Sequence, residues 1–157
     1  LMLSTRIDRA VKQLTQKIIK VFSGAASTVA LTPIPVSDMS VLVPLQLLMV
    51  SFIGYVSGRT VDKKMLKDFL VSLGGVGSLG YSFKLIAQQG TKFLNIVLPG
   101  SGSVLSSTIA YSGTYAMGKA AEAYFIDRVS KKDVATIMKQ AEKEGKAAAK
   151  RDGKTAK

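Results

Sequence analysis

The sequence predicts an all-α protein, a bundle of five or six helices that carries apolar, hairpin-like elements. Apolar residues recur at steps of three and four, or fill whole segments, and no stretch alternates as a strand does. At 157 residues the chain is long enough for one core but not for two. We divide it into an apolar helical domain at 5–129, an amphipathic helix at 130–146 and a basic tail at 147–157, which we expect to be disordered.

The first expected helix runs from about Thr5 to Ala30. Basic residues crowd its first two-thirds, whereas 22–31 carries no charge. We therefore expect it to begin in water and to end buried or in lipid. Its apolar stripe, at helical spacing, is Ile7, Val11, Leu14, Ile18, Phe22, Ala25 and Val29.

A proline-rich corner follows at 32–46. Residues before proline avoid the helical region, so the helix should restart near Asp38, whose carboxylate can cap the new turn. Pro44 then falls inside that helix, where it removes a backbone hydrogen bond and should kink the axis.

Two long uncharged segments decide how the chain is interpreted. Val41–Val56 is apolar on all sides, as in a core helix or one in lipid, and is shorter than the about 20 residues of a regular span. Phe93–Gly118 is longer, but Pro99 and several glycines divide it.

The remaining elements follow from turn and cap signals. Gly58 can end the helix of 41–56, and Thr60 should cap a third helix with apolar residues on one side. We expect a further helix at 81–98, a turn at 99–103, a long helix at 104–129 with a small, hydroxylic first half, and a last helix capped at Ser130.

Composition excludes several kinds of chemistry. The chain has no Cys and no His, so it lacks thiol nucleophiles, disulfides, imidazole bases and the usual zinc ligands. Its carboxylates show no obvious pair in an apolar setting, which general acid–base catalysis would need. We therefore expect a protein that is not an enzyme and has no cofactor and no metal site.

A glycine-rich segment, Gly75–Gly80, matches G-x-G-x-x-G. A dinucleotide site would need a preceding strand and an acid about twenty residues later, and neither is found. A phosphate-binding loop would need lysine where Tyr81 stands. We interpret these glycines as a helix break or a close helix contact.

The formal net charge of +12 indicates either an anionic partner, such as phospholipid, nucleic acid or an acidic protein surface, or a well-solvated surface of a soluble protein. The aromatic residues lie mostly in apolar segments rather than among the basic ones, so we do not expect nucleic acid to be that partner. Basic ends that flank apolar segments fit an anionic membrane surface better, with the basic ends on the cytoplasmic side.

The segments ALTPIPVSDMSVLVPLQLLMV, LPGSGS and AEAYF carry a resemblance that spans most of the chain, from about residue 5 to 146. The matching residues are Pro33, Ile34, Pro35, Asp38, Pro44, Gln46, Pro99, Gly100, Gly102, Tyr124 and Phe125. Together they resemble a bacterial and organellar helical domain known as domain of unknown function six-nine-seven. That domain is found fused to, or encoded beside, small GTPase domains of the Era-like type, and its members are often described as membrane-associated.

The resemblance implies a partner GTPase domain, on the same protein or on a separate chain, and it supplies no catalytic residue. The first hypothesis is therefore a non-catalytic, GTPase-associated helical module at a membrane. The second is a soluble, cytoplasmic all-α protein–protein interaction domain. A third is a membrane-perturbing or pore-forming chain, in which the hydroxylic helix at 101–114 lines a polar path. A homo-oligomer is left open.

Overall fold

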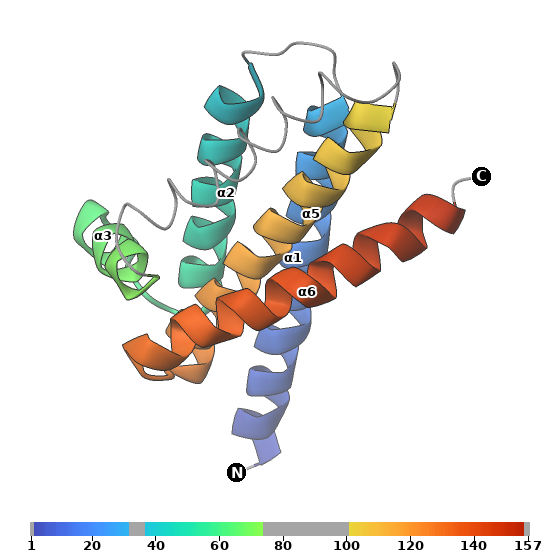
Figure 1. Ribbon diagram of the computed structural model, residues 1–157. Helices are drawn as coiled ribbons and strands as arrows, with labels where there is room; N and C mark the ends of the chain where they lie inside the picture. Colours follow the sequence, from blue (N-terminus) through green and yellow to red (C-terminus); the bar gives the residue numbers. More distant parts are fainter. Residues whose placement is uncertain (1, 32–36, 74–100, 156–157) are drawn as a thin grey trace.

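The computed structural model describes residues 2–31, 37–73 and 101–155, and every element in these ranges is helical, which confirms the all-α prediction (Figure 1). The predicted glycine-rich break and the helix expected at 81–98 lie outside the described residues. The elements are α1 (Met2–Leu31), α2 (Ser37–Val56), α3 (Lys63–Ser72), α5 (Ser101–Glu122), the π-helical turn η1 (Ala123–Asp127) and α6 (Lys131–Thr155).

Three long helices, α1, α2 and α5, run side by side, and α6 packs obliquely across α5 (Figure 1). α5 contacts each of the other three, so it is the central helix of the bundle. The main core joins α1, α2, α3, α5, η1 and α6 through buried side chains. Its largest members are Ile19, Met49, Ile53, Phe69 and Phe125.

The buried side of α1 differs from the stripe that the sequence predicts. The residues that α1 buries, at steps of three and four, are Thr15, Ile19, Ser23, Ala26 and Ala30. α5 approaches this side of α1 closely, since a side chain at Gly118 of α5 would meet Ile19 Cγ1 at 2.7 Å. Ile7 and Leu14, which belong to the predicted stripe, lie on another side of the helix and are about half exposed.

α2 continues through Pro44 and ends at Val56, before Gly58, which has φ of +78° as predicted for a helix-ending glycine. α3 does not begin at Thr60 as expected. Asp62 caps it instead, because Asp62 Oδ1 accepts a 2.7 Å hydrogen bond from the Met65 backbone N–H.

The single helix predicted at 104–129 is divided into two elements in the structure. α5 already begins at Ser101, inside the predicted turn, and ends at Glu122. The chain then widens into η1, which is closed by Arg128 in the left-handed region with φ of 54°. A π-turn of this kind inserts an extra residue and re-aims the side chains that follow it.

α6 extends the fold beyond the predicted boundary. Ser130 lies at its start as expected, with its hydroxyl donating to Asp133 Oδ2 at 2.6 Å. The helix continues through Gly145 to Thr155, so the expectation of a disordered tail from 147 is wrong for 147–155. The helix passes Gly145 because that residue is buried against Ser112 of α5, where any side chain would collide.

Candidate functional site

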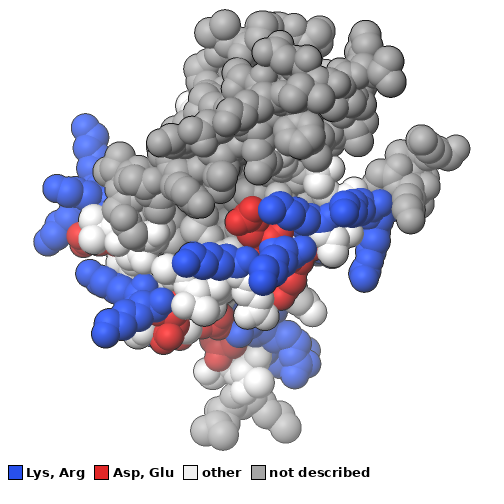
Figure 2. All heavy atoms as spheres, in the orientation of Figure 1, with Lys and Arg blue, Asp and Glu red and all other residues white. Residues whose placement is uncertain are grey.

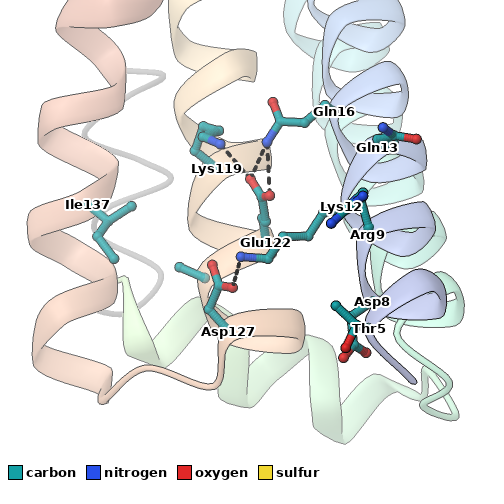
Figure 3. A pocket seen from close by; sticks show the side chains of 11 residues that line it. Thr5, Asp8, Arg9, Lys12, Gln13, Gln16, Lys119, Glu122, Asp127 and Ile137 are labelled. Atoms are coloured by element: carbon teal, nitrogen blue, oxygen red, sulfur yellow. Dashed lines mark hydrogen bonds and ion pairs between the residues drawn. The ribbon is translucent and has the colours of Figure 1, made fainter. Parts of the chain in front are cut away.

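A polar cluster ties α1 to the end of α5, just before the π-turn (Figure 3). Glu122 is 5% exposed, and its carboxylate accepts hydrogen bonds from Gln16 Nε2 at 2.9 and 2.8 Å. Lys119 Nζ lies 2.6 Å from Glu122 Oε2 and neutralises it. The buried charge is therefore paired and hydrogen-bonded, which is the condition for keeping a carboxylate inside a protein. We call these three residues the Glu122 cluster.

A second ion pair lies one turn nearer the N-terminus of α1. Lys12 Nζ is 2.8 Å from Asp127 Oδ1 of η1 (Figure 3). The hydrogen bond and the charge of Asp127 raise the pKa of Lys12, so the lysine is fully charged at neutral pH. The π-turn thus places Asp127 where it can hold the first half of α1.

The two pairs line a cleft of about 690 Å³ between α1, α5, η1 and α6, with Ile137 on its far wall (Figure 3). Its volume suits a small ligand. Two of its three acids, however, are already paired: Glu122 with an amide and a lysine, and Asp127 with Lys12. The third, Asp8, is exposed to solvent. Within the described ranges no group of three or more His, Cys, Asp or Glu could hold a metal ion. These hydrogen bonds and ion pairs hold α1 against α5 and η1.

The charged surface of the molecule is mixed on the face that α6 crosses. Figure 2 shows Lys and Arg side chains around the described part of this face, with acidic side chains between them. Lys and Arg outnumber Asp and Glu by 22 to 10 in the chain, so basic side chains are available on several helices.

The most unusual surface belongs to α2. One side of this helix packs into the core through Met49, Val50 and Ile53. The opposite side carries exposed residues at steps of three and four, and none of them is charged. We call this surface the α2 outer face; it consists of Val41, Pro44, Leu48, Phe52 and Tyr55. A surface helix of a globular protein normally presents polar residues on this side.

Neighbouring helices extend the α2 outer face. On one side the ring of Phe52 lies 5.9 Å from that of Phe22 of α1. On the other, α2 and α3 form an apolar groove of about 290 Å³ that includes Val71, and Lys63 and Lys67 also line it. The apolar surface is thus bordered by cations that can meet an anionic partner.

The residues that the sequence singled out lie in different parts of the structure. Gln46 is buried, and its Nε2 donates a 3.0 Å hydrogen bond to Thr114 Oγ1, joining α2 to α5. Tyr124 and Phe125 lie in η1 and pack edge to face, with Phe125 in the core. Asp38 and Gly102 lie in α2 and α5, and their surroundings lie outside what the structure describes. The residues wholly outside the described ranges are Pro33, Ile34, Pro35, Pro99 and Gly100.

Sequence reasoning missed the Glu122 cluster. Lys119 and Glu122 are three residues apart on one helix, which the sequence shows. Gln16, however, lies 106 residues away, and only the packing of α1 on α5 brings it close. One hypothesis from the sequence made the hydroxylic helix the lining of a polar path. In the structure, Ser112 and Thr114 of this helix are buried inside the bundle.

The fold and its surfaces define a class of protein, an all-α helical bundle with an apolar outer face. No family model, no curated protein and no solved structure matches the chain. The resemblance to the GTPase-associated helical domain therefore stays a prediction. Among the helices of the described ranges, none has the length and hydrophobicity needed to cross a bilayer.

Proposed function

We propose that the protein is a non-catalytic helical module that binds an anionic membrane surface through the α2 outer face and couples a partner G domain to that surface. The observation that carries the proposal is the composition of this face. Its large exposed side chains, Leu48, Phe52 and Tyr55, are 51%, 46% and 61% exposed. Contiguous apolar surface on a folded protein marks a contact with a membrane or a partner.

The architecture indicates how such a contact would form. The inner side of α2 is fixed in the core by Met49 and Ile53, and the buried bond from Gln46 holds it to α5. Only the outer side is therefore offered to lipid, while the bundle stays folded. Lys63 and Lys67 border the apolar surface and would meet anionic headgroups.

The G domain enters the proposal through the sequence resemblance. Its test lies outside this chain: the gene product, or its neighbour, should contain a phosphate-binding loop. A neighbourhood without any such loop would remove the G domain from the proposal and leave the membrane contact.

Vesicle flotation tests the membrane contact. The protein should float with phosphatidylcholine–phosphatidylserine vesicles and bind phosphatidylcholine vesicles more weakly. The double variant Leu48→Gln/Phe52→Gln should lose most binding, because each apolar side chain contributes about 1.5–3 kcal/mol when buried. The matched control, Thr136→Gln/Ala147→Gln on exposed positions of α6, should bind as the wild type does.

A second candidate is a protein–protein interaction domain that uses the same face. Phe52 and Tyr55 favour it, since exposed aromatic residues are common anchors at interfaces. A detergent-free protein that is monomeric and ignores vesicles of either composition would contradict the membrane proposal and favour this one.

A further inference from the structure

Over residues 3–21, α1 is amphipathic in the opposite sense to a normal surface helix. The side of α1 that faces the cleft is polar, and includes Asp8, Lys12 and Gln16. The side that faces away is apolar and exposed: Leu3 is 72%, Ile7 54%, Leu14 49% and Val21 67% exposed. Polar residues are thus directed at the protein and large apolar residues at the surroundings.

These four apolar residues form one continuous stripe. Their spacings of four, seven and seven residues keep them on one side of an α-helix. The bundle does not cover this side, because α1 buries a different set that includes Thr15 and Ile19. Leaving such side chains in water forfeits the free energy that their burial would provide.

Basic residues border the stripe. Lys17 is three residues after Leu14 and four before Val21, and Arg6 is three residues after Leu3, so both lie along its edge. Both are exposed. The one acid of α1, Asp8, lines the cleft instead.

We propose that α1 lies in the plane of a membrane interface, with this stripe among the acyl chains and with Arg6 and Lys17 on anionic headgroups. This inference rests on the proposed function and assigns its lipid-inserting helix and its lipid charge. A helix with an apolar stripe and a basic edge enters the interface to about 5–10 Å. The contact between Phe22 and Phe52 joins α1 to the α2 outer face, so both helices can meet one bilayer.

The Glu122 cluster and the Lys12–Asp127 pair both have a role in this arrangement. Gln16 and Lys12 fasten the cleft side of α1 to α5 and η1. These contacts keep the apolar stripe of α1 on the side that faces away from the bundle. α1 therefore enters the interface as part of the folded bundle.

A fluorescent reporter tests the insertion, because the chain contains no tryptophan. In Leu14→Trp, the emission should shift to shorter wavelength with anionic vesicles, and brominated acyl chains should quench it. The control Thr136→Trp places the reporter on an exposed position of α6 and should show neither effect. Far-ultraviolet circular dichroism should show both variants folded, since both positions are exposed.

A charge test addresses the headgroups. Arg6→Gln/Lys17→Gln should weaken binding to phosphatidylserine-containing vesicles about 30-fold, from the usual contribution of a basic residue near an anionic surface. Binding to phosphatidylcholine should not change. Lys139→Gln/Lys143→Gln removes the same charge from exposed positions of α6 and should have a much smaller effect.

The outcomes separate the two proposals. If the wild type floats with vesicles but Leu14→Trp is neither shifted nor quenched, α1 is not the inserting helix and the proposed function stands. If the two charge pairs weaken binding equally, α1 does not carry the headgroup contact. If the wild type binds neither kind of vesicle, both proposals are wrong.

Discussion

Two glycine-to-alanine substitutions should have opposite effects on stability. Gly145 lies in α6 where a Cβ would stand 2.9 Å from Ser112 Cα and 3.2 Å from Ser112 O, both backbone atoms of α5. Backbone cannot move aside as a flexible side chain can, so α6 must shift away. Gly24 lies in α1 with nothing within 4 Å of its Cβ position.

The magnitudes follow from two opposing terms. Alanine is favoured over glycine inside a helix by about 0.5–1 kcal/mol, which applies to both positions. Overpacking at Gly145 costs about 1–3 kcal/mol. Gly24→Ala should therefore raise the free energy of unfolding by about 0.5–1 kcal/mol. Gly145→Ala should lower it by about 1 kcal/mol.

Urea unfolding followed by circular dichroism measures both variants against the wild type. The shift of the midpoint should have opposite signs, with an unchanged slope. Equal stabilisation by the two substitutions would show that α6 does not cross α5 at Ser112. It would leave the helical conformation at Gly145 standing, because alanine is favoured over glycine inside a helix.

Three further predictions concern caps, buried polar groups and pH. Asp62→Ala should cost about 1 kcal/mol of stability as a lost helix cap, whereas Thr60→Ala should stay within about 0.5 kcal/mol; the reverse order in urea unfolding would restore Thr60 as the cap. Gln46→Ala should cost about 2 kcal/mol because it removes a buried hydrogen bond to α5, and an unchanged midpoint would contradict that bond. The pKa of Lys12 is raised in the folded protein, so its pair with Asp127 stabilises the fold below the ordinary lysine pKa and is lost as pH rises through the raised value. The stability difference between wild type and Lys12→Met should be constant near neutral pH and shrink only in strong alkali; a difference that changes near pH 7 would refute this assignment.

The sequence predicts the helices well where hydrophobic spacing and turn residues agree. The apolar side of α3, with Phe69 buried, and the end of α2 before Gly58 both follow from spacing and glycine chemistry. These features depend on neighbours within a few residues, which a sequence displays directly.

The orientation of α1 could not be predicted in this way. Hydrophobic spacing favours the larger residues, such as Ile7 and Leu14, as the buried side. The structure buries Ser23 and Ala26 instead, because close contact between two helices selects small residues rather than the most hydrophobic ones. Which of two apolar sides is covered depends on the partner helix, and that partner is distant in sequence.

The Glu122 cluster could not be predicted from the sequence for a related reason. A glutamate beside a lysine on an exposed helix is common, and its burial depends on α1 lying across it. The π-turn that places Asp127 against Lys12 has no comparable sequence signal. Long-range polar contacts of this kind appear only once the helices are packed.

The central claim is that the α2 outer face meets lipid, and a single reporter on that face tests it most directly. Phe52→Trp introduces the only tryptophan of the chain at a half-exposed position. We predict that its emission shifts to shorter wavelength with phosphatidylserine-containing vesicles and is quenched by brominated acyl chains. An unshifted, unquenched emission from protein that floats with those vesicles would show that the α2 outer face does not touch the bilayer.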